Sequence, residues 1–173
     1  MEARRPNIIL VGLSGSGKTA IGRAAARELH WPFIDFDTEI EHREHASVAE
    51  IFARESESHF RGLEQELTRE LVTCGGTIMS AGGGWVTNRE SVALLHPTGR
   101  IIYLRASPEL LVARLASARV PRPLLAVHDP LGALSAMYEA RRAYYEEADL
   151  VLETEVLDRK QLIDEVCRYA LSL

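Results

Sequence analysis

The sequence lacks a long hydrophobic run and lacks an excess of positive charge. No stretch of about 18 consecutive apolar residues occurs in the chain, which excludes a membrane-spanning helix. Arginine and lysine number 20 against 25 aspartates and glutamates, and the net charge of −5 argues against broad binding to nucleic acid or to a membrane surface. We therefore expect the important basic residues to act locally, on phosphates or on a carboxylate.

Cysteine is also scarce. Cys74 and Cys167 are far apart and match no metal-binding or redox spacing, so we expect two reduced thiols in a cytoplasmic protein. The first apolar run begins directly after Pro6, and we expect no signal or transit peptide before it. The length of 173 residues suits one well-buried domain, which we assign to residues 1–173.

The most informative stretch is Gly12-Leu13-Ser14-Gly15-Ser16-Gly17-Lys18-Thr19, which has the spacing of a phosphate-binding loop. A β-branched apolar run precedes it and a helix-forming run follows it. Its glycines would let backbone N–H groups turn towards phosphate oxygens at a helix N-terminus. Lys18 would reach the β- and γ-phosphates, and the Thr19 hydroxyl would ligate Mg²⁺. The predicted nucleoside triphosphate site consists of Gly15, Ser16, Gly17, Lys18, Thr19 and Ala20.

Two aspartates end the next predicted strand, over residues 33–37. Asp35 and Asp37 are two residues apart and would share one face of that strand. Ligands bind at the carboxyl edge of parallel sheets, so we place Asp35 near Mg²⁺ and Asp37 nearer to a second substrate. The alternative is that Asp37 only caps a helix over residues 38–44.

Two further segments carry candidate binding residues. A predicted helix over residues 55–72 places Arg61 and Glu64 on one face, which also fits a plain surface ion pair. Gly62 costs this helix about 1 kcal/mol relative to alanine, so we expect something to approach it closely. Three glycines at 82–84 follow a predicted strand and indicate either a turn against a ligand or a simple loop.

Alternation of strands and helices predicts the fold class. Expected strands lie at 7–11, 33–37, 77–80, 100–104 and 150–152. This order predicts a three-layer α/β sandwich around a five-stranded parallel sheet. Pro121 and Pro123 break the helical pattern, and we expect residues 118–130 to form a mobile lid carrying Arg119 and Arg122. Lid closure would exclude water and deliver an arginine, for which Arg122 is the better candidate.

These features together predict phosphoryl transfer to a small molecule. The chain contains no Asn-Lys-x-Asp stretch, which disfavours a switch GTPase. Over nearly its whole length the sequence resembles the shikimate kinase family, which has a P-loop fold like that of nucleoside monophosphate kinases. The resemblance is carried, in order, by Gly12–Thr19, Asp35-Phe36-Asp37, Phe60-Arg61-Gly62-Leu63-Glu64, Gly82–Gly84, Arg122-Pro123-Leu124-Leu125 and the arginine helix before Tyr145-Glu146-Glu147.

The resemblance implies ATP-dependent phosphorylation of the 3-hydroxyl of shikimate, on the path to chorismate and the aromatic amino acids, in a monomer that uses ATP and Mg²⁺. Asp37 would bind shikimate hydroxyls and accept the proton, with Thr19 and Asp35 at the metal. The implied catalytic residues are Lys18, Asp37 and Arg122. The implied shikimate-binding residues are Asp37, Arg61, Gly82, Gly83, Gly84 and Arg141. Arg114 would lie along the adenine, and Arg122 would reach the ATP phosphates.

The chain departs from the family pattern at two places. The family has Arg-x-Pro-Leu-Tyr where this chain has Arg141-Arg142-Ala143-Tyr144-Tyr145. Arg141 keeps the four-residue step to Tyr145 and is assigned as the second carboxylate clamp, but the early position of Asp149 leaves Arg142 open. Trp85 replaces a small residue and would either narrow the acceptor pocket or pack against the lid.

Two other functions fit parts of the pattern. One is a related kinase of another polyol acid, such as gluconate, although the triple glycine and Arg61 favour shikimate. The other is a regulatory binding module without turnover, which we disfavour because Lys18, Asp35, Asp37 and Arg122 are all present.

Overall fold

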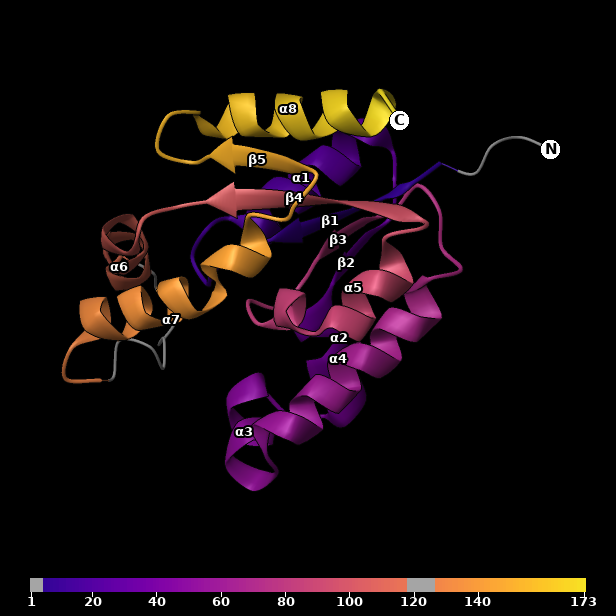
Figure 1. Cartoon of the computed structure of the whole chain (residues 1–173). Helices are drawn as coiled ribbons and strands as arrows, with labels where there is room; N and C mark the ends of the chain where they lie inside the picture. Colours follow the sequence, from indigo (N-terminus) through magenta and orange to yellow (C-terminus); the bar gives the residue numbers. More distant parts are fainter. Residues whose placement is uncertain (1–4, 118–126) are drawn as a thin grey trace.

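A parallel five-stranded sheet organises the computed structural model, which describes residues 5–117 and 127–173 (Figure 1). The strand order across the sheet is β2-β3-β1-β4-β5. The elements are β1 (Asn7–Val11), α1 (Lys18–Leu29), β2 (Phe33–Asp35), α2 (Phe36–Glu44), α3 (Val48–Arg54), α4 (Glu57–Leu71), β3 (Ile78–Ser80), the 3₁₀ helix η1 (Trp85–Thr87), α5 (Arg89–Leu95), β4 (Gly99–Arg105), α6 (Pro108–Ala116), α7 (Pro130–Tyr145), β5 (Leu150–Glu153) and α8 (Arg159–Leu171). The predicted α/β class with a five-stranded parallel sheet is confirmed.

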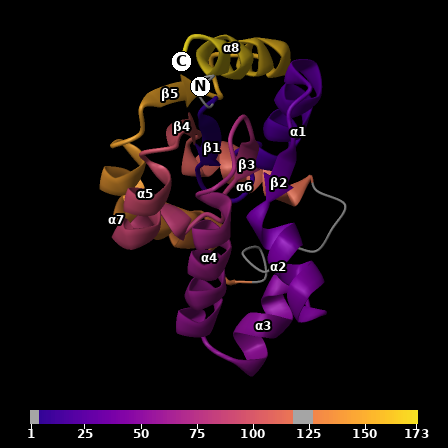
Figure 2. The same cartoon turned by 90° about the vertical axis from the view of Figure 1, so that its right-hand side faces the viewer.

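The central strand β1 is buried on both of its faces. Ile8 and Leu10 pack into the apolar core shared with α1 and α8, whereas Ile9 and Val11 pack into the core on the other face. Side chains alternate across a strand, so a continuous apolar run is what a doubly covered strand requires. Figures 1 and 2 show α1 and α8 on one side of the sheet and α2, α3 and α4 on the other. This gives the three predicted layers.

The strand register brings the candidate residues to one edge. Leu10 lies beside Ser80, and Ser80 lies beside Asp35, so β1, β3 and β2 end level with one another. Gly12, Gly82 and Asp37 each lie two residues beyond this row, at the carboxyl edge of the sheet. The arrowheads of β4 and β5 point to this same side in Figure 1, where α6 and α7 lie.

The second strand is shorter than predicted. It ends at Asp35 rather than Asp37, because Asp35 is the N-cap of α2 and its carboxylate accepts a hydrogen bond from the Thr38 N–H at 3.1 Å. Asp37 therefore lies in the first turn of a helix. The assignment of a strand over residues 33–37 was wrong, as was the alternative that Asp37 caps the helix.

Local signals in the sequence set several other helix ends. Ser47 and Glu50 form a capping box at the start of α3, and Ser107 caps α6 with Pro108 as its first residue. The proposed lid at 118–130, including Arg119 and Arg122, lies mostly outside the described residues.

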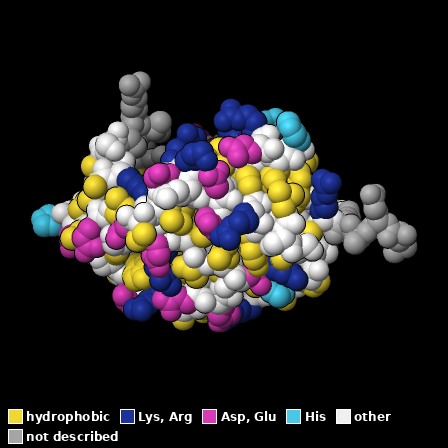
Figure 3. All heavy atoms as spheres, turned by 90° about the horizontal axis from the view of Figure 1, so that it is seen from above, with side chains coloured by type: hydrophobic (Ala, Val, Ile, Leu, Met, Phe, Trp, Pro, Cys, Tyr) yellow, Lys and Arg dark blue, Asp and Glu magenta, His cyan; other side chains and the backbone are white. Residues whose placement is uncertain are grey.

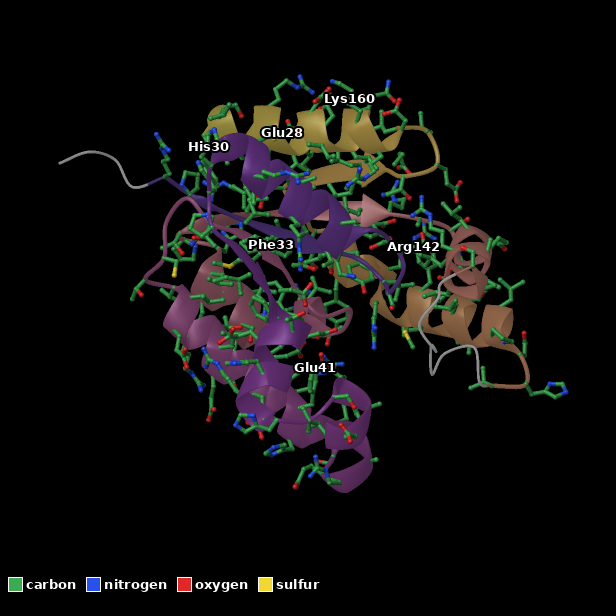
Figure 4. The ribbon with its side chains drawn as sticks, turned by 180° about the vertical axis from the view of Figure 1, so that it is seen from behind. Glu28, His30, Phe33, Glu41, Arg142 and Lys160 are labelled. Carbon is green, nitrogen blue, oxygen red and sulfur yellow. The ribbon has the colours of Figure 1, made fainter. Side chains whose placement is uncertain are left out.

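Charges of both signs alternate on the face that carries α8 (Figure 3). Exposed ion pairs join residues one turn apart along this helix, Lys160 with Asp164 and Arg168 with Glu165. Glu28, on the neighbouring α1, and Lys160 are labelled in Figure 4. Among the residues that the structure describes, no helix has the length and apolar character needed to cross a bilayer.

Candidate active site

A pocket of about 370 Å³ opens at the carboxyl edge of the sheet. Its lining combines the phosphate-binding loop (Gly12–Thr19), the ends of β2 and β3, and α6. The lining residues are Ser14, Gly15, Gly17, Lys18, Thr19, Ala20, Asp35, Asp37, Ser80, Ala81, Gly82, Gly83, Arg114 and Leu115. Most of the predicted site residues are thus brought together by the fold.

The phosphate-binding loop presents backbone N–H groups to this pocket. Gly15 and Gly17 have φ angles of 88° and 100°, a left-handed conformation that glycine adopts without strain. Gly17 is also the N-cap of α1, and no side chain caps the first N–H groups of that helix. These uncompensated donors, at the positive end of the helix dipole, form a site for an anion. Ser16 contributes only its backbone, since its side chain is buried beneath the loop.

Lys18 is held across the loop. Its Nζ donates to the carbonyl oxygens of Gly12 at 2.7 Å and of Leu13 at 3.1 Å. Burial lowers the pKa of Lys18 to about 8, against the opposing charges of Asp37 and Asp35. A triphosphate beside this ammonium group would raise that pKa again, because an opposite charge favours the protonated form.

Thr19 and Asp35 form a pair of oxygen ligands suited to a small divalent cation. The Thr19 hydroxyl donates to Asp35 Oδ2 at 2.6 Å, and Ser80 Oγ lies 3.4 Å from the same hydroxyl. No group of three or more His, Cys, Asp or Glu side chains suited to a metal occurs within residues 5–117 and 127–173. Kinases hold Mg²⁺ by one or two protein oxygens together with phosphates and water, and this pair fits that arrangement.

Asp37 faces the phosphate-binding loop from the first turn of α2. Burial raises its pKa, and the nearby carboxylates of Asp35 and Glu41 add to the effect, while Lys18 and Arg61 oppose it. A carboxylate whose pKa is raised in this way is a stronger base than a solvated one. Asp37 can therefore accept a proton from a hydroxyl group bound in the pocket.

Arg61 lies beside the pocket and is paired with Glu64. Arg61 Nη1 donates to Glu64 Oε2 at 2.5 Å, and the Glu64 side chain is only 2% exposed. The ion pair predicted as an alternative role for Arg61 is present, but it is largely buried at the site rather than on the surface. A Cβ at Gly84 would overlap the Arg61 guanidinium, so the third glycine makes room for this arginine.

Glu64 lies beside the site, although sequence analysis assigned it no role beyond the ion pair with Arg61. Its Oε1 atom is buried and has no hydrogen-bond partner among the described residues, and a Cβ at Gly82 would overlap it. Burial raises the pKa of Glu64, with Asp37 adding to the effect, whereas Arg61 and Arg141 oppose it. The sequence signals for Glu64 were its position three residues after Arg61 and its place in the motif Phe60-Arg61-Gly62-Leu63-Glu64.

The two candidate arginines of α7 have different surroundings. Arg141 is half-buried, and its Nη1 would lie 3.4 Å from a Cβ placed at Gly83. Arg142, labelled in Figure 4, is exposed and donates from Nε to Glu146 at 3.0 Å. The structure thus places Arg141, and not Arg142, beside the glycine turn (Gly82–Gly84).

Arg114 extends from α6 to the phosphate-binding loop. Its Nη1 lies 3.4 Å from the Gly15 carbonyl, and its Nη2 lies 3.3 Å from the Thr154 carbonyl after β5. The guanidinium group therefore forms one wall of the pocket beside the phosphate-binding loop, and its position along the adenine stays a prediction. Arg122, the predicted lid arginine, lies outside the described residues.

The expectation that Trp85 narrows the acceptor pocket was wrong, and the alternative contact with the lid lies mostly outside the described residues. Its side chain is fully buried in the core, in edge-to-face contact with Phe36 at 6.1 Å between ring centroids. Its Nε1–H donates to the Thr68 hydroxyl at 2.9 Å, and this hydroxyl donates to the Glu64 carbonyl at 2.7 Å. Trp85 thus ties the end of the glycine turn to α4 and does not line the pocket.

The close approach expected at Gly62 is also absent. A Cβ at this exposed position would meet nothing within 4 Å among the described residues. The glycine that does accommodate a close neighbour is Gly84.

Comparison with known proteins identifies closely similar chains. The profile of a family described as shikimate kinase matches residues 14–171. A shikimate kinase of Cupriavidus pinatubonensis is 45% identical over 155 residues, which is 89% of this chain and 80% of that protein. Shikimate kinase from Acinetobacter baumannii, solved in complex with shikimate, superposes with a TM-score of 0.88 at 34% identity over 96% of this chain and 93% of that one. A gluconokinase from Sinorhizobium meliloti shares only the fold, with a TM-score of 0.60 at 17% identity over 98% of this chain and 92% of that one.

Proposed function

This chain belongs to the shikimate kinase family, and we propose that it transfers the γ-phosphoryl group of ATP to the 3-hydroxyl of shikimate. The product is shikimate 3-phosphate, an intermediate on the path to chorismate. The observation that best supports this function is that Lys18, Thr19 and Asp37 line one pocket. Asp37, as the proton acceptor, would then face the loop that binds the triphosphate.

On the nucleotide side, backbone N–H groups at Gly15 and Gly17 bind the phosphates and Lys18 neutralises the transferring group. Thr19 and Asp35 would hold Mg²⁺, which would supply positive charge to offset that of the transferring phosphate. Arg114 supports the nucleotide where the loop meets β5. Arg122 is the proposed arginine that closes over the phosphates.

On the acceptor side, Asp37 orients the reacting hydroxyl and takes its proton as the new P–O bond forms. Arg61 and Arg141 bind the carboxylate of shikimate, because two guanidinium groups match one carboxylate in charge and geometry. The backbone of Gly82, Gly83 and Gly84 contacts the ring hydroxyls. Holding both reactants in one pocket supplies most of the rate enhancement expected for phosphoryl transfer.

The oligomeric state of the enzyme and its cellular compartment are part of the same proposal. We propose that the enzyme is a monomer. The two cysteines are free thiols, which supports a reducing compartment such as the cytoplasm.

The test is shikimate-dependent release of ADP by the purified chain with ATP and Mg²⁺, run beside gluconate as a competing polyol acid. We expect turnover with shikimate, little turnover with gluconate, and shikimate 3-phosphate identified by mass spectrometry. Preference for gluconate would move the assignment to the other kinase, and ATP binding without turnover would favour a regulatory module.

A further inference from the structure

A tyrosine at the end of α7 is hydrogen-bonded to the glycine turn. The Tyr145 hydroxyl donates to the carbonyl oxygen of Gly83, and the Tyr145 side chain is 0% exposed. Gly83 lines the pocket, whereas Tyr145 does not. The hydroxyl therefore lies behind the turn, where it contacts the Gly83 carbonyl and is also close to the Arg141 side chain.

The ring of Tyr145 is fixed by a second tyrosine. It stacks on Tyr103 of β4 with 4.8 Å between ring centroids and an interplanar angle of 12°. Within the described residues, no recorded hydrogen bond involves the Tyr103 hydroxyl. Tyr145 thus contacts the glycine turn, whereas Tyr103 only packs against the Tyr145 ring from the sheet.

The Tyr145 hydroxyl remains a donor throughout the physiological pH range. Burial raises its pKa to about 12, although Arg141 opposes the shift. A protonated phenol donates to the Gly83 carbonyl, whereas a phenolate would repel it.

Gly83 occupies the narrow space between the two sides of the site. A Cβ placed there would lie 3.4 Å from Arg141 Nη1 and 3.6 Å from the Gly12 carbonyl oxygen. Arg141 is one helical turn before Tyr145 on α7, so both residues move with the same helix. A shift of the turn would change its distance to Arg141 and to the phosphate-binding loop at the same time.

We propose that the Tyr145 hydroxyl is a positioning group for acceptor binding. It holds the glycine turn at the correct distance from Arg141. This inference rests on the proposed function, because it concerns the shikimate side of the same pocket. The phosphate-binding loop is held by its own glycines and by Lys18, so ATP binding does not depend on the hydroxyl.

The test compares Tyr145→Phe with Tyr103→Phe. Each variant removes one hydroxyl from the stacked pair and keeps both rings. Loss of one buried hydrogen bond predicts an increase of about threefold to tenfold in the KM for shikimate in Tyr145→Phe. We expect the KM for ATP to change less than about twofold, and the calorimetric Kd for shikimate to rise with its KM. Tyr103→Phe is expected to match the wild type in these constants.

Thermal unfolding separates positioning from general damage. A large loss of Tm in Tyr145→Phe with both KM values raised would assign the hydroxyl to stability and overturn the proposal. An unchanged KM for shikimate, or an equal increase in Tyr103→Phe, would also overturn it. If the wild-type chain itself shows no shikimate-dependent turnover or binding, the proposed function fails instead, and that result is read before any variant is compared.

Discussion

The nucleotide side and the acceptor side of the pocket draw on the polypeptide in different ways. The proposed nucleotide side is mainly one continuous stretch, Gly12–Thr19, which offers backbone N–H groups and a helix terminus. The acceptor side takes Asp37, Arg61, Gly83 and Arg141 from four separate segments, and most of these groups are charged side chains.

The two sides also differ in how their charges are arranged. Burial raises the pKa values of both Asp37 and Glu64 on the acceptor side, where two arginines offset the carboxylates. A buried charge without its partner is costly, so each member depends on the others. The nucleotide side has one buried cation, Lys18, which is satisfied by two carbonyl oxygens. We infer that acceptor binding is the more fragile property under mutation.

The largest effect is expected from Asp37→Asn, which removes the proton acceptor and keeps the side-chain size. We expect kcat to fall by about 10²- to 10⁴-fold, because this is the usual contribution of a general base. The measurement is steady-state ADP release at saturating substrates. Glu39→Gln on the same helix is the control, since Glu39 pairs only with Arg43 at the surface and should leave kcat unchanged. A kcat within about threefold of wild type in Asp37→Asn would remove the base from the mechanism.

A smaller effect is expected from Arg141→Ala. Loss of a charge-assisted contact with a carboxylate costs about 1.5–3 kcal/mol, so the KM for shikimate should rise by roughly 10- to 100-fold. Arg142→Ala is the matched control, because Arg142 is exposed and pairs with Glu146. Initial-rate kinetics with shikimate varied would distinguish them, and the reverse ranking would show that Arg142 is the clamp.

The smallest effects are expected from alanine at two glycines near Arg61. Gly84→Ala would displace the guanidinium, and we expect the KM for shikimate to rise severalfold. Gly62→Ala meets no neighbour, so it should stabilise α4 by about 0.5–1 kcal/mol and leave both KM values unchanged. Chemical denaturation and kinetics measure the two properties separately. Equal effects of the two substitutions on KM would contradict a specific contact between Gly84 and Arg61.

The same contrast explains what could be predicted from the sequence. The phosphate-binding loop is a local pattern, and its strand, turn and helix follow directly from residues 7–29. Asp37 was assigned to the right pocket for a wrong physical reason, since strand alternation was assumed where the Asp35 cap had already started a helix. Local propensity does not reveal such a competition between a strand end and a helix cap.

The residues of the acceptor side come from separate segments, so they could be predicted only from the family resemblance or seen in the structure. Arg141 and Arg142 are adjacent, and only the packing of α7 against the glycine turn distinguishes them. The core position of Trp85 could not be predicted, because its hydrogen-bond partner, Thr68, lies 17 residues away in sequence. The hydroxyl of Tyr145 likewise contacts a residue 62 positions away, and no sequence pattern indicates that contact.

The amine of Lys18 has a chemical consequence beyond phosphate binding. Lys18 and Lys160 are the only lysines in the sequence. With a pKa of about 8, roughly a tenth of the Lys18 side chains are neutral at pH 7, and a neutral amine is a nucleophile. Lys160 has its pKa raised by Asp164 and stays protonated. We therefore expect acylating electrophiles to react at Lys18 rather than at Lys160, and we expect ATP to protect Lys18 from them.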